Sequence, residues 1–255
     1  MKTFLKSFLK KCLNNYVNLS YTLRHLTKWK KINSIDLSID DNLISKKIFG
    51  NIARGDYEID ENKILQKTFT SDDVLLELGT GIGFNAIYCA KINNNKVLTF
   101  EGNPNMIPLI RKNMEKNNVE FALRNEIVIS KNFHNSSFSF NVVEDFWSSS
   151  LKTVDANIIN KVNVPTTNIN DIVENFRPTY LVVDIEGGEE DLFDECDWIA
   201  NSPIKKILLE LHADIIGEEK CFMVMNNIIQ KGFKMSFDGG PKNVVYFFRS
   251  CTWLR

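Results

Sequence analysis

The sequence predicts an α/β fold built on a mostly parallel sheet, with a helical arm ahead of it. From about residue 50 onward, short apolar or β-branched segments alternate with helical segments, which is the pattern of βαβ units. A glycine-rich turn joins one buried strand to the helix that follows it. The 255 residues, 44% of them hydrophobic, can bury one sizeable core. We therefore expect an N-terminal arm at residues 1–48 and one α/β domain at residues 49–255.

Seven segments have the length and composition of strands, and four have those of helices. We expect strands at residues 74–78, 96–101, 126–130, 180–185, 206–212, 234–237 and 244–249, and helices at about 84–92, 104–117, 189–193 and 218–231. Residues 138–164 interrupt this order with alternating phenylalanines and a run of serines. An inserted hairpin, or a loop that faces the substrate, is expected there.

Charge and cysteine content narrow the class of protein. The 31 basic and 32 acidic residues give a net charge of −1, so no chain-wide field favours a nucleic-acid partner. No apolar run reaches the length of about 18 residues that a membrane-spanning helix needs. The five cysteines lack the spacing of a disulfide framework or a zinc site. Lysines interrupt the apolar start, so we expect no cleaved signal and a cytoplasmic protein.

Residues 1–31 hold eight of the basic side chains and no acidic one. Apolar residues recur there at helical spacing between the lysines, as in a basic amphipathic helix. Such a stripe usually packs on its own domain, and that is the first expectation. The alternative is peripheral contact with an anionic membrane surface, on the inner face of the membrane, or docking of a partner.

The glycine-rich turn predicts a nucleotide-type site. Glycines let the backbone turn sharply and approach a ligand, and the start of a helix offers free N–H groups. The spacing is GxGxG, whereas dinucleotide sites have GxGxxG, and Phe84 stands where the third glycine would fall. The residues expected to hold the ligand here are Gly79, Thr80, Gly81, Gly83 and Asn85.

Two acidic residues extend this site. Glu77 precedes the first glycine, where its charge would repel a pyrophosphate and attract the sulfonium and ammonium groups of S-adenosylmethionine. Opposite charges about 4 Å apart attract by roughly 4 kcal/mol at an effective dielectric of about 20. The alternative is that backbone N–H groups simply hold Glu77. Glu101 ends the next strand, where an acid accepts hydrogen bonds from ribose hydroxyls.

Four segments together resemble the FkbM family of S-adenosylmethionine-dependent methyltransferases. They are residues 77–83, 100–104, 164–169 and 183–189, and the resemblance runs from about residue 55 to His212. It implies a class I methyltransferase (Rossmann-like) fold, with a seven-stranded sheet, helices on both faces and an antiparallel last strand. It also implies methyl transfer, usually to an oxygen and often to a sugar or polyketide-type hydroxyl. Relatives often have alanine and asparagine in the glycine turn, where this chain has Thr80 and Gly81.

Polar residues cluster where two later strands end, and ligands of open α/β sheets gather at that edge. Asp184 and Glu186 are two residues apart, as are Glu210 and His212. We expect Asp184, Glu186 and His212 to be catalytic, with His212 or Asp184 preferred as the base that deprotonates a hydroxyl. Alternatively, Asp184 holds the methionine ammonium, Glu186 caps a helix and His212 binds a loop.

No metal site is assigned from the sequence. Carboxylates with one imidazole suit magnesium or manganese, but no closely spaced ligand set is visible and ion pairs use the same residues. The expected acceptor is a small molecule or glycan, and Tyr57 and residues 147–150 are expected to line its pocket. Two other functions are a nicotinamide-dependent dehydrogenase or epimerase, and a non-catalytic S-adenosylmethionine-binding module. The sequence predicts no oligomeric state.

Overall fold

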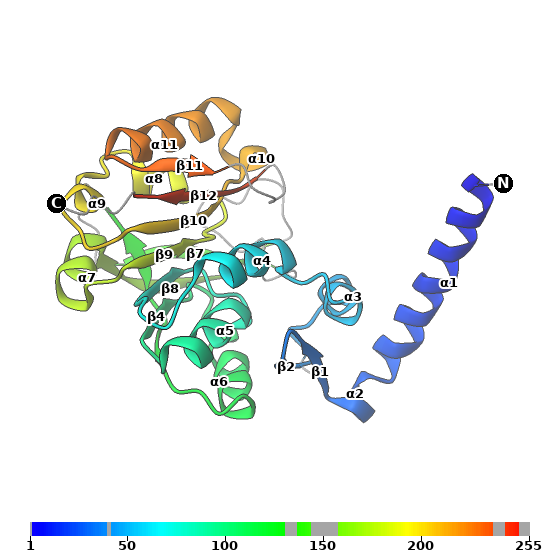
Figure 1. Cartoon of the computed structure of the whole chain (residues 1–255). Coiled ribbons are helices and arrows are strands. Elements are labelled where there is room, and N and C mark those ends of the chain that lie inside the picture. Colours follow the sequence, from blue (N-terminus) through cyan, green and yellow to red (C-terminus); the bar gives the residue numbers. More distant parts are fainter. Residues whose placement is uncertain (1, 40–41, 131–136, 144–157, 237–242, 250–255) are drawn as a thin grey trace.

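The computed structural model describes residues 2–39, 42–130, 137–143, 158–236 and 243–249. Its centre is a seven-stranded sheet with the order β11-β12-β10-β9-β3-β4-β5 (Figure 1). The strands are β3 (Leu75–Leu78), β4 (Val97–Phe100), β5 (Ala122–Arg124), β9 (Tyr180–Val183), β10 (Lys206–Glu210), β11 (Lys234–Ser236) and β12 (Val244–Phe248). Neighbours from β10 to β5 are parallel, and β12 is antiparallel to β10 and β11. The predicted mostly parallel sheet with an antiparallel last strand is confirmed.

Helices cover both faces of the sheet, as predicted. One face packs against α4 (Ile59–Thr68), α5 (Phe84–Asn93), η1 (Pro104–Met106) and α6 (Ile107–Lys116). The other packs against α7 (Ile169–Phe176), α8 (Glu189–Phe193), α9 (Asp197–Ala200), α10 (Ala213–Ile216) and α11 (Glu218–Gln230). Successive strand residues point to opposite faces, so Leu75 joins the first core and Leu76 the second. A strand buried on both faces is mostly apolar, which explains the hydrophobic runs; the polar exceptions Glu77 and Thr99 bind each other.

The N-terminal residues form α1 (Lys2–Thr22), α2 (Arg24–Thr27), the hairpin β1 (Trp29–Ile32) and β2 (Ile35–Ser38), and α3 (Lys46–Arg54). The hairpin packs on α6, where Asn113 Oδ1 accepts a 2.9 Å hydrogen bond from the Ser38 N–H. Leu37 and Ile48 lie in the same core as α5 and α6. The chain therefore contributes to the main core well before residue 49, while the domain boundary at residue 48 stays a prediction.

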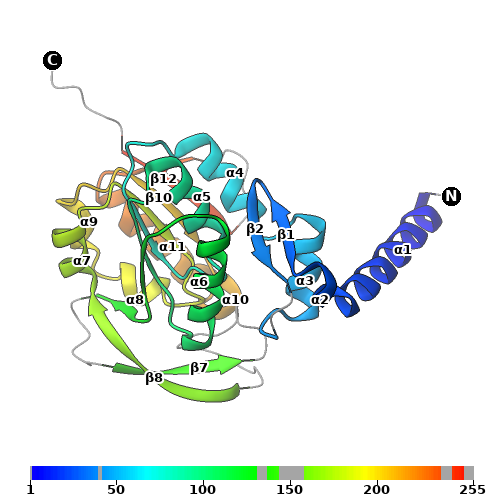
Figure 2. The same ribbon diagram turned by 90° about the horizontal axis from the view of Figure 1, so that it is seen from below.

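Helix α1 projects away from the body of the protein in both views (Figures 1 and 2). Its buried Val17 joins the main core, and Gly50 of α3 lies opposite it. Leu13, Tyr16 and Leu19 on the same helix are exposed, by 43%, 58% and 63%. Among the described helices, none combines the length and the apolar character that crossing a membrane requires.

A second, three-stranded sheet stands beside the main one and is clearest in Figure 2. It has the order β6-β8-β7, with β6 (Ile127–Ile129), β7 (Ser137–Val143) and β8 (Ile158–Asn168). β7 and β8 pair antiparallel, which confirms a hairpin in the segment where one was expected. Trp147 and the serines at 148–150, predicted to line the acceptor pocket, lie outside the described residues.

One strand prediction was wrong. The segment 126–130 was expected in the main sheet, but β6 pairs with β8 in the second sheet. The main-sheet edge is β5, in which Ala122 and Arg124 are exposed. An edge strand with one solvent-exposed face needs no continuous apolar run. The hydrophobic pattern therefore did not predict β5. The Ile-Val-Ile sequence of β6 is apolar because it packs beside the site described next.

Candidate active site

A cavity of about 580 Å³ opens where the parallel strands end. The turn after β3 supplies Gly79 and Gly81, and Glu101 follows β4. Asp184 follows β9, and Glu210 ends β10. Ligand sites of this size are usual for cofactors and small substrates, and this edge of an open α/β sheet is where such ligands bind.

The glycine turn presses the end of β3 against the end of β9. Gly79 has a φ of +79°, and a Cβ atom on it would lie 1.7 Å from the backbone oxygen of Asp184. No side chain fits in that space, and L-residues disfavour that φ. Glycine at position 79 therefore allows the close approach of the two strand ends, while the approach of a ligand to this turn stays a prediction.

The predicted cofactor residues divide into two groups. Gly79, Gly81, Glu101 and Asp184 line the cavity. The second group is not among the described residues that line the cavity. It consists of Glu77, Thr80, Gly83 and Asn85. Asn85 lies behind the cavity wall and donates a 2.9 Å hydrogen bond to Glu58 Oε2, and Glu58 itself lines the cavity. Gly83 directly precedes α5 and has a φ of +85°, so it allows the chain to turn from the glycine segment into the helix.

Glu77 lies under the cavity and is 2% exposed. Its Oε2 accepts a 2.6 Å hydrogen bond from the Thr99 hydroxyl on the neighbouring strand. Burial raises the pKa of Glu77 to about 7. The strand alternation turns this side chain to the same face as Leu75, so its carboxylate is held inside the fold.

Glu101 stands at the tip of β4, where the sequence placed it. Its carboxylate accepts hydrogen bonds from the N–H groups of Gly81, at 3.1 Å, and Asn103, at 2.7 Å. Burial raises the pKa of Glu101 to about 7, although these N–H groups favour the ionised form. The same carboxylate therefore links the glycine turn to the loop after β4.

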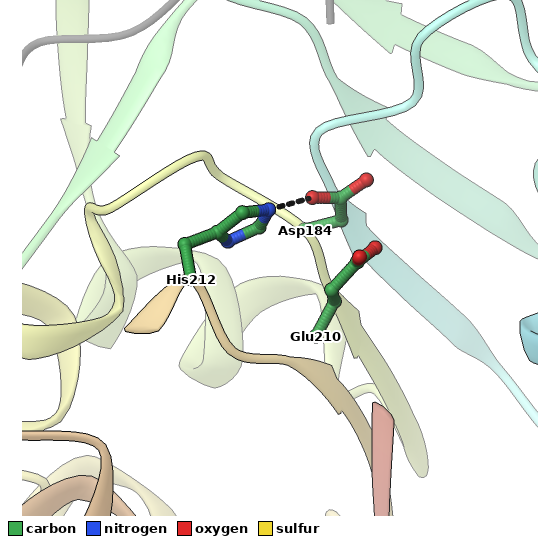
Figure 3. A group of neighbouring side chains, drawn as sticks. All are labelled: Asp184, Glu210 and His212. Carbon is green, nitrogen blue, oxygen red and sulfur yellow. Dashed lines mark ion pairs between the residues drawn. The ribbon is translucent and has the colours of Figure 1, made fainter. Parts of the chain in front are cut away.

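Asp184, Glu186, Glu189 and His212 form one cluster, and Figure 3 shows Asp184 and His212 pointing toward each other beside Glu210. His212 Nε2 lies 3.5 Å from Asp184 Oδ1 and 3.3 Å from Glu186 Oε2. His212 Nδ1 lies 2.9 Å from Glu189 Oε1. The structure therefore brings together the three predicted catalytic residues and adds Glu189, which sequence reasoning had placed only on a helix.

Burial and mutual repulsion dominate the electrostatics of this cluster. Burial raises the pKa of Asp184 well above its usual value, and that of Glu186 to about 7. Burial and the Asp184 charge raise the pKa of Glu210 to about 8. Burial by itself lowers the pKa of His212, but its hydrogen bond to Glu189 and the surrounding carboxylates raise it to about 10. Without a ligand, His212 is therefore an imidazolium between acids.

Sequence reasoning missed several residues of the cavity wall. Glu58 and Glu61 reach it from the start of α4, and Lys47 and Asn51 from α3. Tyr57, which was expected there, is also part of the wall. These residues precede the glycine turn by some twenty residues or more, and no local motif connects them to it. The acidic segment at 56–61 contains Glu58 and Glu61, but no such sequence feature marks Lys47 and Asn51.

The wall is strongly acidic. Its carboxylates are Glu58, Glu61, Glu101, Glu126, Asp184, Glu186, Asp191, Glu210 and Asp214. Among the described residues that line the cavity, Lys47 and His212 are the basic side chains. A cavity of this composition favours a cationic or neutral ligand and disfavours a phosphorylated one.

Comparison with known proteins gives a family match. The sequence model described as the Methyltransferase FkbM domain matches residues 77–249. A search of curated proteins gave no match.

Solved structures with similar folds include three methyltransferases. The precorrin-6y C5,15-methyltransferase of Geobacter metallireducens GS-15 is 12% identical, with a TM-score of 0.43, and the match covers 76% of this chain and 89% of that one. A methyltransferase of Pyrococcus furiosus is 16% identical, with a TM-score of 0.42 and coverages of 76% and 83%. M. jannaschii TYW2 in complex with AdoMet is 13% identical, with a TM-score of 0.42 and coverages of 87% and 86%.

Proposed function

The chain belongs to the FkbM methyltransferase family, and from this we propose that it methylates a hydroxyl oxygen of a small molecule or glycan, with a sugar as the expected acceptor. Family membership makes the chain a methyltransferase of the class I fold that uses S-adenosylmethionine, and it sets aside the dehydrogenase or epimerase alternative. The choice of oxygen rests on one observation. Carboxylates and an imidazole, the groups that deprotonate a hydroxyl, face the cavity beside the glycine turn.

The cavity fits S-adenosylmethionine. The donor carries sulfonium and ammonium charges, and the wall is acidic. Gly79 and Gly81 line the cavity without a side chain, and the Glu101 carboxylate can accept hydrogen bonds from ribose hydroxyls. Once bound, the donor supplies an electrophilic methyl group.

The chain itself has to orient and deprotonate the acceptor. A neutral alcohol is a poor nucleophile, and a positioned base accelerates such reactions by about 10²–10⁴-fold. Both ring nitrogens of His212 face carboxylates, Nδ1 toward Glu189 and Nε2 toward Asp184 and Glu186. We therefore assign proton acceptance to a carboxylate, with Asp184 preferred over Glu186 because Asp184 directly follows β9, the strand paired with the one that ends in the glycine turn. His212 holds both in place.

The acidic wall also selects the acceptor. A nucleic acid or a sugar phosphate would bring negative charge against the carboxylates of the cavity. A neutral sugar instead offers hydroxyl donors to these carboxylates and a ring face to Tyr57. We therefore propose a neutral glycan or polyol acceptor and no nucleic-acid partner.

Transfer from S-adenosylmethionine with a deuterated methyl group tests this function. Neutral polysaccharide and lipid-linked sugar extracts serve as acceptors for the full-length protein. We expect labelled products in which the methyl group survives mild alkali, as an ether does and an ester does not. Tight binding of S-adenosylhomocysteine without transfer to any hydroxyl would instead indicate the non-catalytic module.

The affinity for S-adenosylhomocysteine is expected to fall in acid. Ribose hydroxyls donate to the ionised Glu101 carboxylate, whose pKa is about 7. Ionisation is nearly complete about one unit above that pKa and small about one unit below it, so affinity should fall about tenfold from about pH 8 to about pH 6. Calorimetry of the wild type and of Glu101→Gln at both pH values measures this affinity.

Glu101→Gln keeps the shape of the side chain and removes its titration. We expect it to bind more weakly at the higher pH and to lose the part of the pH dependence that Glu101 causes. Other cavity acids titrate in both proteins, so only the difference between the two curves counts. Parallel curves would show that Glu101 does not bind the ribose.

We also propose that α1 attaches the protein to an anionic membrane surface. Residues 1–31 have no acidic side chain, and α1 projects from the body (Figure 1). Leu13, Tyr16 and Leu19 are exposed on it, whereas its Val17 is buried against the domain. Exposed apolar side chains on a basic helix are suited to the boundary between lipid headgroups and acyl chains.

Leu13→Asp combined with Leu19→Asp should weaken vesicle binding by more than about tenfold, because each leucine contributes about 1.5–3 kcal/mol when buried. Co-sedimentation with phosphatidylserine vesicles measures it, and neutral phosphatidylcholine vesicles are the control. The substituted positions are exposed, so the fold should be unchanged. Equal sedimentation of variant and wild type would exclude the membrane contact.

A further inference from the structure

Asp184 and Glu210 leave the sheet side by side. Strands β9 and β10 are parallel, and Val183 pairs with Leu209, so the next residues along each strand are Asp184 and Glu210. His212 follows two residues later and turns back toward them (Figure 3). One side-chain ligand atom from each of the three lies within 4.8 Å of the others. Three residues from two strand ends thus converge on one point of the cavity wall.

Two further residues hold this group in position. Glu189 is fully buried, accepts a hydrogen bond from the Gly187 N–H, and lies 2.9 Å from His212 Nδ1. That contact directs Nε2 toward Asp184 and Glu186. Asn243 donates a 2.7 Å hydrogen bond to Glu210 Oε1. A histidine whose one nitrogen is held by a carboxylate, while the other faces further ligands, is the usual arrangement around a protein-bound metal.

One atom of the group is left without a hydrogen bond. Asp184 Oδ1 is buried, and within the described part of the chain it has no hydrogen-bond partner. The 3.5 Å from Oδ1 to His212 Nε2 is too long for a strong hydrogen bond. A buried carboxylate oxygen without a donor is costly, and a cation bound there would remove that cost.

We propose that Asp184, Glu210 and His212 bind one divalent cation of the Mn²⁺ type. Two carboxylate oxygens and one imidazole nitrogen form a mixed set that suits manganese, and Mg²⁺ is the hard-cation alternative for the same geometry. Ligands on opposite sides of such an ion, at about 2.1 Å each, are about 4.2 Å apart. The present spacing closes onto an ion with small side-chain movements. His212 Nε2 gives up its proton to the solvent when it binds the ion.

The site does not depend on the proposed acceptor, because its ligands and their support are independent of any substrate. The bound cation would also take part in the proposed methyl transfer. A cation here faces the cavity and would bind the acceptor hydroxyl and lower its pKa. Each carboxylate has two oxygens, so Asp184 can bind the ion with Oδ1 and still accept a proton with Oδ2.

Titration of metal-depleted full-length protein with Mn²⁺ tests the proposal, with no donor or acceptor present. Electron paramagnetic resonance follows the free ion. We expect one Mn²⁺ per chain, displaced by Mg²⁺ in excess. His212→Ala and Glu210→Gln should each weaken binding at least tenfold. Glu189→Gln should weaken it about 10–100-fold, the usual effect of removing the carboxylate that orients a histidine ligand.

Glu126→Gln is the matched control, because it removes one negative charge from the same cavity and none of the described hydrogen bonds or ion pairs of the three ligands involves Glu126. It should leave Mn²⁺ affinity unchanged. Cooperative thermal unfolding checks each fold, and the near-isosteric Glu210→Gln and Glu189→Gln carry the test if His212→Ala does not fold. The proposal is overturned if Mn²⁺ does not bind stoichiometrically, or if Glu126→Gln weakens binding as much as the ligand variants do. In either case the cluster is an ion-paired imidazolium and not a metal site. Either result is separate from hydroxyl methylation, which the deuterium-transfer assay measures.

Discussion

Gly79→Ala is expected to abolish S-adenosylhomocysteine binding and to lower the free energy of unfolding by about 2–5 kcal/mol. The left-handed backbone conformation costs an alanine about 1–2 kcal/mol, and overpacking typically adds about 1–3 kcal/mol. The overpacking is severe here, because the new Cβ would lie 1.7 Å from the Asp184 backbone oxygen. Relief requires the ends of β3 and β9 to separate, which would distort the turn that the donor approaches. Urea denaturation and calorimetry measure the two effects.

Gly55→Ala is the control for that prediction. Gly55 has almost the same backbone conformation, with a φ of +78°, but no atom lies within 4 Å of the position of its Cβ. We expect this variant to lose only the conformational cost of about 1–2 kcal/mol and to keep cofactor binding. Equal losses in the two variants would mean that the close approach at Gly79 is not what the site requires.

Asp184→Asn should lower kcat by about 10²–10⁴-fold while changing S-adenosylhomocysteine affinity little. The amide keeps the size of the side chain but cannot accept the acceptor's proton. It also removes the negative charge that faces His212 and the proposed cation. Initial rates with the acceptor from the transfer assay measure kcat, and calorimetry measures the affinity.

Glu126→Gln again supplies the comparison, since it removes a charge from the cavity wall at a residue that takes no part in the described ion pairs of the cluster. Its kcat should stay far above that of Asp184→Asn. A loss of donor affinity in Asp184→Asn with kcat preserved would contradict a role in proton transfer. It would identify Asp184 as the partner of the methionine ammonium, which was the alternative that the sequence left open.

Local patterns were enough to predict most of the fold. Six of the seven main-sheet strands were located, and for β3, β4, β9 and β10 the reason is that buried parallel strands are almost continuously apolar. The glycine turn and Glu101 were placed correctly relative to each other because a βαβ unit has nearly constant length. The failure at β5 has the same cause, since an exposed edge strand lacks the apolar run on which such predictions depend.

Glu77 shows that a sequence motif does not by itself fix the direction of a side chain. Its place before the first glycine suggested a carboxylate facing the donor, yet it lies under the cavity and binds Thr99. The direction of a side chain at a strand end depends on which residue is the last to obey the strand alternation. Leu75 and Glu77 share one face, and the chain turns only at Gly79.

The sequence by itself determined the class of fold, the glycine turn that we propose as the donor site and the residue types of the proposed catalytic cluster, because each depends on neighbours within about one βαβ unit. Only the tertiary structure decided that Glu189 holds His212, that Asn243 binds Glu210, and that α3 and α4 close the cavity. Those contacts join segments from different elements of the chain, and strand register and helix packing set them rather than any local spacing.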